Sequence, residues 1–580
     1  MFLRMARRLT IPNSWQLIAL SAVYQWPLLL LLLLAARQGL AQDSLAEEHP
    51  NELRGTVINA VTQAPIPRAL VSSADNRFAM LTDSEGQFAF TLPKEQAEAD
   101  GDGALLGGTV YVRTRNNVWL SARKPGFFEA PADSRATRSS EGDLILRLVP
   151  ESLIIGRIHL SGDEGLPRAT VQLFPREVID GVPHWVPGPV ERTNSAGEFR
   201  FAELRAGQYK LLSHELRDDD PLASVQGQTH GYPPVYYPGA ADFASAATIN
   251  LAAGQTVETD LSPVRQRYYN VKIPIANQDI GGINVSVVGQ QGPGFSLGYN
   301  AAAKRIEGLL PNGTYTIQAN AFGPASSSGT VSLSVEGADV EGRAMTLIPS
   351  SSVRLEVKEE FTDTSSIGSA SWGDGKRTFT VRGPRRYLQP RVESADDFEP
   401  VRGGSLRSPT GPNDDSLVLE NLPPGKYWLR LDTAHGYVAS ARMGSLDLLH
   451  QPFTLVSGSS PTIEIEMRDD GAQIEATVTN PDETGSEGRE ALGPDRWVYC
   501  VPVADSPGRF QEGPVSEDGK FEHSMLAPGG YRILAFARRQ PRLPYRDPEA
   551  MRAYETRGVV IHVAAGEKLS VQVPLIPDSD

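Results

Sequence analysis

The chain has almost no cysteine. Its 580 residues include a single one, Cys500, so no intrachain disulfide can form. Small extracellular domains often depend on disulfides, but a domain of about 100 residues can bury enough apolar surface without them. Cys500 lies in the strand-like run 497–503, and we expect it to be a buried core thiol rather than a reactive group.

Positive charge is also scarce. The chain has 55 Lys and Arg residues against 70 Asp and Glu residues, a net charge of −15. Loss of residues 1–41, which hold four arginines and no acidic residue, would take the net charge to −19. Such an excess of negative charge repels phosphate backbones and anionic lipid surfaces. The balance therefore argues against nucleic acid and membrane surfaces as partners and favours solubility.

Catalytic and metal-binding motifs are missing. The nine histidines are scattered singly, without the spacing of a zinc site, and no nucleophile elbow or phosphate-binding loop occurs. His49 and Glu52 have the His-x-x-Glu spacing of zinc carboxypeptidases but no third ligand nearby, so we interpret the match as chance. Asp100 and Asp102 lack the further oxygen donors of a calcium loop. We predict that the protein is not an enzyme and holds no cofactor and no metal.

Long hydrophobic runs are confined to the N-terminus. Three arginines in the first eight residues precede the apolar run 27–36, and small residues follow up to Ala41. This pattern predicts a secretory signal peptide over residues 1–41. The alternative is an uncleaved anchor, since the span 17–36 is about long enough to cross a bilayer. No later segment is apolar enough to span a membrane, and we expect a secreted, periplasmic or cell-surface protein.

A repeated turn is the most frequent pattern in the chain. It is clearest in TNSAGEFRFAELRAGQY, residues 193–209, and returns in SEDGKFEHSMLAPGGY, residues 516–531. In each, a polar turn ends in glycine and an aromatic residue, and a second glycine ten residues later precedes tyrosine. Glycine permits the positive φ of such turns, and the alternating apolar residues indicate strands. The second turn recurs at 204–209, 310–315, 422–427 and 526–531, a spacing that predicts tandem domains.

The first repeats resemble the carboxypeptidase regulatory-like family. The resemblance rests on LRGTVINAVTQAPIPRALV (53–71) followed by TDSEGQF, and on IGRIHLSGDEGLPRATV (155–171) followed by TNSAGEF and LRAGQY. The match is good for 52–150 and 153–262, partial for 415–468 and 495–577, and weak for 265–350. It implies a seven-stranded transthyretin-like sandwich, grouped with carbohydrate-binding-like folds, in a non-catalytic bacterial secreted protein. The first repeat lacks the Gly-x-Tyr corner of the family.

The sequence thus predicts an all-β chain. With 54 glycines and 44 prolines, it has the composition of many short strands and turns. We expect a tandem array of about five small antiparallel β-sandwich modules, transthyretin-like or immunoglobulin-like, after the signal peptide. The expected boundaries are 1–41 for the signal peptide, 42–51 for a linker, and 52–150, 151–263, 264–349, 350–468 and 469–580 for the modules, of which the third is degenerate. A long polar, irregular loop is expected at 361–408.

One aromatic residue breaks the alternation of its strand. Tyr427 and Leu429 should face the core of the fourth module, so Trp428 should face outward. The matching positions of the other repeats are polar. An outward tryptophan either stacks on a ligand or packs against a neighbouring module, and both interpretations remain open.

Four further aromatic residues are candidate binding residues. Trp185 and Trp372 lie in turn-rich segments, the first within an expected loop at 176–190, and Tyr236 and Tyr237 lie in a Pro/Tyr-rich loop. Each tryptophan either stacks on a sugar ring or covers the end of its sandwich, and the tyrosines have structural packing as their alternative.

Two classes of function follow. The resemblance makes carbohydrate, a polysaccharide or glycan, the expected ligand of a secreted, non-catalytic binding protein, with exposed tryptophans beside polar side chains. The alternative is a structural spacer or protein-interaction module of the cell envelope, with an envelope protein as partner, buried tryptophans and strand edges that pair with the partner.

Overall fold

The structure is a computed structural model of the chain. It describes residues 52–73, 77–91, 112–113, 119–130, 136–138, 143–218, 228–276, 282–292, 294–321, 326–364, 367–368, 370–373, 378–396, 398, 402–411, 413–479, 496–503, 506–516, 518–537 and 539–576. The expected signal peptide and linker lie outside these residues. No helix among the described residues has the length and apolar character needed to cross a bilayer.

The described chain is built almost entirely of strands, which we group into five modules. Module one contains β1 (Glu52–Asn59), β2 (Leu70–Ser73), β3 (Ala79–Leu81), β4 (Gln87–Thr91), β5 (Val112–Arg113), β6 (Trp119–Arg123), β7 (Phe127–Glu129), β8 (Ala136–Arg138) and β9 (Leu144–Pro150). Module two contains β10 (Ser152–Arg157), β11 (Thr170–Ile179), β12 (Val182–Trp185), β13 (Val190–Arg192), β14 (Glu198–Leu204), β15 (Gly207–Ser213), β16 (Leu216–Arg217), β17 (Thr229–Tyr232), β18 (Val235–Tyr236), β19 (Ile249–Leu251) and β20 (Thr256–Glu258). Module three contains β21 (Gln266–Pro274), β22 (Ile283–Val287), β23 (Leu297–Asn300), β24 (Arg305–Pro311), β25 (Gly313–Ala321), β26 (Ser327–Val335), β27 (Val340–Glu341) and β28 (Ile348–Pro349).

The last two modules complete the described chain. Module four contains β29 (Ser351–Glu360), β30 (Ala370–Gly373), β31 (Thr378–Val381), the 3-10 helix η2 (Gly383–Arg386), β32 (Leu388–Ser394), β33 (Arg402–Gly403), β34 (Ser405–Leu406), β35 (Leu417–Leu422), β36 (Gly425–Thr433), β37 (Tyr437–Met443), β38 (Leu446–Asp447), β39 (Phe453–Leu455) and β40 (Thr462–Arg468). Module five contains β41 (Ala472–Thr479), β42 (Trp497–Pro502), β43 (Gln511–Pro514), β44 (Lys520–Leu526), β45 (Gly529–Phe536), α3 (Pro548–Met551), η3 (Arg552–Tyr554), β46 (Val559–Val563) and β47 (Lys568–Ile576).

Each module closes on itself in the same way. Its first strand pairs in antiparallel fashion with a strand from the middle of the module and in parallel fashion with a strand near the end of the module. The parallel pairs are β1 with β9, β10 with β20, β21 with β27, β29 with β40, and β41 with β47. A separate cluster of buried apolar side chains lies inside each of the five modules. The predicted all-β array of sandwich modules is therefore confirmed.

The repeated second turn forms a tyrosine corner in four modules. In each copy the tyrosine hydroxyl donates a hydrogen bond to the backbone carbonyl four residues earlier, which ties the turn to the strand that follows it. The donors and acceptors are Tyr209 and Arg205 at 2.7 Å, Tyr315 and Pro311 at 3.0 Å, Tyr427 and Pro423 at 2.8 Å, and Tyr531 and Ala527 at 2.7 Å. This bond gives the recurring tyrosine a structural role that the spacing alone did not show.

The polar first turn is held by its threonine. The buried Thr193 hydroxyl donates to the Leu166 carbonyl at 2.7 Å and accepts from the Ala169 amide at 2.8 Å. Thr82 makes the same pair of bonds in module one. The side chain of Asn194 then accepts the amides two and four residues on, both at 2.9 Å. The threonine therefore satisfies backbone groups of the segment before β11 in module two and before β2 in module one, and the asparagine satisfies those of its own turn.

The expected irregular loop at 361–408 is wrong over much of its length. Strand β32 lies within it and pairs with β36 from Leu388 to Ser394. Leu388 and Val392 are buried in the core of module four. The polar residues between them face outward, and this alternation over a short stretch was hidden by the polar composition of the whole segment.

Loss of one corner hydroxyl should weaken one module. Tyr531 is fully buried, and Tyr531→Phe leaves the Ala527 carbonyl without its donor. We expect the free energy of unfolding of module five to fall by about 1–2 kcal/mol, measured by denaturant unfolding. Tyr237→Phe, which changes a tyrosine outside any corner, is the matched control and should unfold like the wild type. Equal stability of the two variants would contradict the structural role of the corner.

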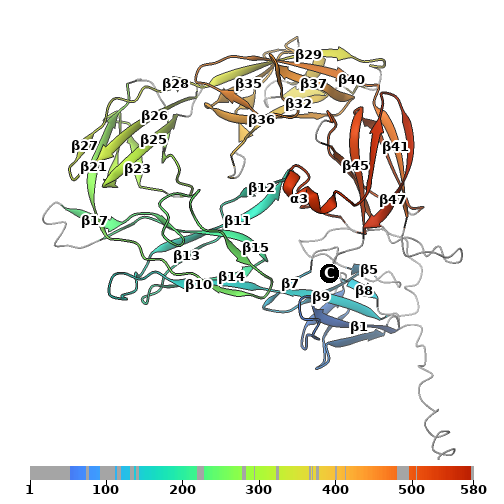
Figure 1. Ribbon diagram of the computed structural model, residues 1–580, viewed down its shortest axis with the longest axis horizontal. Coiled ribbons are helices and arrows are strands. Elements are labelled where there is room, and N and C mark those ends of the chain that lie inside the picture. The colour runs from blue at the N-terminus through green and yellow to red at the C-terminus, as the bar shows by residue number, and fades with distance from the viewer. Residues whose placement is uncertain are drawn as a thin grey trace, which may run out of the picture.

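The modules follow one another around an arc (Figure 1), and module five returns towards module two. The junction of modules two and three is a continuous sheet, because β17 pairs with β21 from Thr229 to Gly231. On the opposite side of the arc, β12 and the short helix α3 approach each other below β36 (Figure 1). This arrangement brings side chains that are hundreds of residues apart into contact.

Candidate functional site

A hairpin of module two extends towards modules four and five. Strands β11 and β12 pair up to Ile179 and Val182, and Asp180 and Gly181 form the two-residue turn with φ of 48° and 78°. Two positive φ values are the conformation that the dipeptide Asp-Gly favours between strands. The prediction of a loop over 176–190 is therefore wrong for this hairpin, although the Asp-Gly signal was present in the sequence.

The tip of this hairpin binds module five and module four at once. Asp180 accepts a hydrogen bond from the Tyr545 hydroxyl at 2.6 Å and forms an ion pair with Arg546. The Arg546 guanidinium also donates to the Asp180 carbonyl at 2.9 Å, and the Arg546 amide donates to the Gly181 carbonyl at 3.0 Å. Arg430 of module four lies 3.5 Å from the same Asp180 carboxylate. One carboxylate thus joins three modules.

Close packing makes glycine necessary at the tip. A Cβ atom on Gly181 would lie 2.6 Å from the Tyr545 ring, well inside van der Waals contact. The Tyr545 ring also stacks on Phe510, with centroids 3.8 Å apart and an angle of 8° between the planes. The hairpin tip therefore packs against a stacked aromatic pair.

The outer face of β32 and β36 supplies further charges at this contact. Arg430 donates to Glu393 at 2.9 Å, and Arg391 lies 3.1 Å from Glu393. Asp432 forms ion pairs with Arg391 and, at 2.6 Å, with Arg509 of module five. We refer to the following set as the Asp180 junction: Asp180, Gly181, Arg391, Glu393, Arg430, Asp432, Arg509, Tyr545 and Arg546.

Arginines outnumber carboxylates in the Asp180 junction. Burial, followed by repulsion from Arg546, lowers the pKa of Arg430. Burial and repulsion from Arg546 and Arg391 likewise lower the pKa of Arg509. These guanidiniums stay charged at any physiological pH, so the junction carries four positive charges against three negative ones. Asp180 is the carboxylate of this set that comes from module two.

The junction should be insensitive to pH until strongly acidic conditions. Burial alone would raise the pKa of Asp180, but Arg546, the Tyr545 hydroxyl and Arg430 together hold it below the ordinary value of 3.8. A carboxylate whose pKa is lowered on contact formation stabilises that contact above its ordinary pKa and loses the effect as the pH falls through the lowered one. We expect the radius of gyration, measured by small-angle X-ray scattering, to be constant from pH 8 to about pH 5. An increase within that range would contradict this assignment.

A second contact buries an aromatic cluster on the outer face of module two. The cluster consists of Phe174, Trp185, Leu212, Tyr236, Phe243 and Ala246. Phe398 of module four inserts into it, with its ring centroid 5.5 Å from that of Phe243. The Tyr236 hydroxyl also bonds to the backbone of Gln291 in module three. It donates to the Gln291 carbonyl at 2.7 Å and accepts from the Gln291 amide at 2.9 Å. Modules two, three and four therefore share one apolar contact.

This contact decides the placement of two predicted site residues. Trp185 is only 5% exposed and covers the outer face of its sandwich beside module four. Tyr236 is fully buried, and burial raises the pKa of its hydroxyl to about 12. The packing alternative therefore describes both residues.

The other candidates are less enclosed. Trp428 is half-buried on the face opposite Tyr427 and Leu429, both of which lie in the core. Its predicted outward orientation is confirmed, and Arg430 lies over its ring at 5.4 Å. Tyr237 is half-buried against the core of module two. Trp372 lies in β30 opposite Phe379, but its side chain falls outside the described part of the structure. Ligand binding by these residues stays a prediction.

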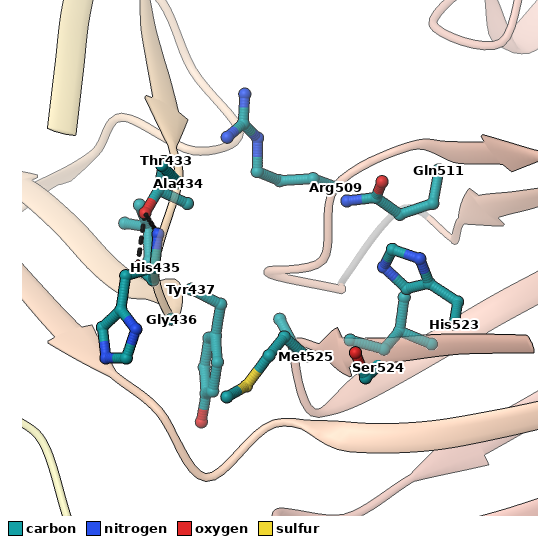
Figure 2. A pocket seen from close by; sticks show the side chains of 13 residues that line it. Thr433, Ala434, His435, Gly436, Tyr437, Arg509, Gln511, His523, Ser524 and Met525 are labelled. Atoms are coloured by element: carbon teal, nitrogen blue, oxygen red, sulfur yellow. Dashed lines mark hydrogen bonds between the residues drawn. The ribbon is translucent and has the colours of Figure 1, made fainter. Parts of the chain in front are cut away.

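A cleft of about 280 Å³ lies beside the Asp180 junction, between modules four and five. Figure 2 shows Arg509, Gln511 and His523 of module five facing the turn at Thr433 and Ala434 of module four. Arg509 belongs to both features, since it lines the cleft and also bonds to Asp432. Burial lowers the pKa of His523, so its imidazole is neutral at pH 7 and can both donate and accept hydrogen bonds.

Sequence reasoning found neither of these two features. The hairpin tip and the cleft are formed by residues that lie far apart in the chain, and no local spacing indicates them. Within the described residues no group of three or more His, Cys, Asp or Glu side chains is placed to hold a metal ion. His49, Asp100 and Asp102 lie outside those residues.

Cys500 should be inert in the folded protein. It is buried in the core of module five, and burial raises the pKa of its thiol to about 12. Because the thiolate is the reactive form, we expect no reaction with a thiol reagent such as dithionitrobenzoate at pH 8 until the protein is denatured. Rapid stoichiometric reaction under native conditions would show that this core is open.

No family model and no curated protein matches the chain, so its resemblance to the carboxypeptidase regulatory-like family stays a prediction. Among solved structures, similarity is found to a streptococcal ancillary pilin (11% identity, TM-score 0.16, covering 53% of this chain and 98% of that one). It is also found to the Bacillus anthracis TIE protein (10%, 0.13, 76% and 75%) and to BcpA, the major pilin subunit of Bacillus cereus (11%, 0.13, 55% and 99%). Scores this low carry no argument about function.

Proposed function

We propose that the chain is a non-catalytic structural protein outside the cytoplasm, a scaffold that holds five β-sandwich modules in a set arrangement for contacts with other envelope proteins. The observation that supports this most is the Asp180 junction, in which one carboxylate of module two bonds to side chains of modules four and five. A spacer of independent modules has no need for such a contact.

The burial of two aromatic side chains supports the same proposal. A carbohydrate-binding array exposes its tryptophans beside polar groups. Here Trp185 and Tyr236 are buried in contacts between modules, in a cluster with Phe398, and Tyr236 bonds to Gln291. Buried tryptophan at a module contact is what the protein-interaction alternative predicts, and large apolar contacts of this kind restrict motion between domains.

The arrangement can be tested by distance measurement between spin labels. Val190 in module two and Val560 in module five are about half exposed, at 50% and 54%, and Val190→Cys with Val560→Cys provides two labelling sites. Cys500 is buried and takes no label. We expect pulsed electron paramagnetic resonance on the exported protein to give one narrow distance distribution. A broad distribution, as in a flexible string of modules, would overturn the proposal.

Carbohydrate binding remains the second candidate because Trp428 keeps part of its ring accessible on an outer face. A screen of the exported protein against polysaccharides and oligosaccharides separates the two functions. Saturable binding that Trp428→Ala abolishes would establish carbohydrate binding. Our proposal expects no binding across a panel that a known lectin recognises, and Trp185→Ala would then lower stability without any effect on a ligand.

A further inference from the structure

We infer that the cleft between modules four and five is a docking site for a short extended segment of a partner protein, with a carboxylate of that segment placed at Arg509, Gln511 and His523. This inference rests on the proposed scaffold function and gives it a partner of defined chemistry. It draws on four features of the cleft: its strand edges, its bulge, its charge and its size.

Two strand edges border the cleft. Within the described part of module five, strand β44 lies at the end of its sheet and pairs with β41 alone. On the module-four side of the cleft, one edge of β37 pairs with β40 from Tyr437 to Arg442. Its other edge pairs with β38 at Arg442 and Met443. The stretch from Tyr437 to Ser440 is thus an edge among the described residues. Edge strands present backbone donors and acceptors that an added extended segment can use.

A β-bulge directs β44 into the cleft. The register with β41 shifts between Ala472 and Ile474, and Met525 has a φ of 64°. Ser524 and Met525, the two residues of β44 that lie opposite the single residue Gln473 of β41, line the cleft. Bulges at such positions re-aim side chains and end regular pairing, and they often lie next to functional sites.

The same kind of bulge contacts another module elsewhere in this chain. Asn421 is the equivalent residue of module four, with a φ of 62° and the same kind of register shift. Its side-chain carbonyl accepts a hydrogen bond from the Ser326 hydroxyl at 3.1 Å and lies 3.4 Å from the Ser326 amide. Ser326 belongs to module three, at the start of a strand. The bulge of module four is therefore in contact with a residue of module three, whereas that of module five faces the cleft.

The charge of the lining favours an acidic segment. The thirteen residues that line the cleft include Arg509, Gln511, His523 and Ser524 but no Asp or Glu, in a chain with a net charge of −15. Asp432, the ion-pair partner of Arg509, is shared with Arg391, so positive charge is in excess here. A carboxylate would receive charge-assisted hydrogen bonds from Arg509 and neutral ones from Gln511 and His523.

The size of the cleft limits the occupant. At about 280 Å³ it lies just below the usual range of about 300–1,000 Å³ for drug-sized ligands. It admits a few residues of an extended chain, which advances by about 3.3 Å per residue. Leu526 and Ala527, both buried, give the cleft an apolar base on which side chains of such a segment can rest. A folded partner domain would have to present a terminus or a loop.

Phage-displayed random heptapeptides, selected on the exported protein, provide the probe. The inference expects enriched peptides that contain Asp or Glu. Fluorescence anisotropy with such a peptide should show at least tenfold weaker binding to Ser524→Trp, which fills the cleft, and to Gln511→Ala, which removes a donor. Changing the peptide Asp to Asn should weaken binding to the wild type to a similar degree. Val560→Ser, which changes an exposed side chain of the same module that does not line the cleft, is the matched control and should bind like the wild type.

Failure of the inference is distinguishable from failure of the scaffold. If no peptide discriminates the wild type from both cleft variants, or if the Asn peptide binds equally well, the docking site is refuted. Saturable binding of an oligosaccharide that Ser524→Trp abolishes would reassign the cleft to carbohydrate. The label pair at positions 190 and 560 reports independently on the scaffold. If the distance distribution is narrow and no peptide is selected, only the docking site is overturned. If the distance distribution is broad, the scaffold is overturned as well.

Discussion

Gly156→Ala is expected to prevent module two from folding stably. A Cβ atom at this position would lie 1.7 Å from the carbonyl oxygen of Thr259 and 2.6 Å from the Phe199 ring. The backbone of β10 cannot retreat, because it is paired with β14 on one side and β20 on the other. Overpacking a core usually costs about 1–3 kcal/mol, and here the obstacle is backbone rather than a flexible side chain. We expect the free energy of unfolding of module two to fall by an amount at or above the upper end of that range.

Thermal unfolding followed by calorimetry, with limited proteolysis to identify the affected module, measures this effect. Gly55→Ala should act in the same way on module one, because its Cβ would lie 2.2 Å from the Leu144 carbonyl oxygen. Gly239→Ala is the matched control, since no atom lies within 4 Å of its added Cβ. A Gly156→Ala protein that unfolds at the wild-type temperature would contradict the close approach of the paired strands.

Asp180→Ala is expected to release module two from modules four and five while every module stays folded. The change leaves Arg430, 12% exposed, and Arg546 without their shared carboxylate. Removing one member of a buried charge pair costs about 2–5 kcal/mol. The lower end applies, because the Asp180 side chain remains 32% exposed. The narrow distance distribution between labels at positions 190 and 560 should become broad, and the radius of gyration should increase.

Two comparisons make this prediction specific. Asp163→Ala removes a carboxylate of the same module that pairs with Arg157 at 3.1 Å but is 82% exposed, and it should leave the distribution narrow. Gly181→Val, which places a side chain against the Tyr545 ring at a φ of 78°, should broaden it as Asp180→Ala does. If Asp180→Ala keeps the wild-type distribution, the Asp180 carboxylate is not what holds module two against modules four and five.

The repeated corner is the part of the fold that sequence reasoning predicted best. Several of the bonds that it makes are local. Asn194 accepts two amides of its own turn, and Tyr209 bonds four residues back. Because such bonds depend on spacing alone, any module that keeps the spacing keeps the corner. The orientation of Trp428 was predictable for the same reason, since strand alternation decides it.

The errors concern residues whose partners lie far away in the sequence. Trp185 was expected in a loop, but it lies in β12 of a hairpin and packs with Phe398 of module four. Residues 388–394 were assigned to an irregular loop, although they pair with β36 more than thirty residues later. Local composition carries no information about such partners. The Asp-Gly turn at 180–181 was readable as a hairpin, but not as the point at which three modules meet.

The amino-acid sequence by itself determined the class of the fold: short strands, a corner repeated about every hundred residues, and cores that need no disulfide. It could do so because turn conformations and strand alternation depend on neighbouring residues. The tertiary structure alone decided which outer faces meet, and with them the Asp180 junction, the burial of Trp185 and the cleft beside Arg509. These contacts join residues as far apart as Asp180 and Arg546. Only the packing of whole modules brings such charges and rings together.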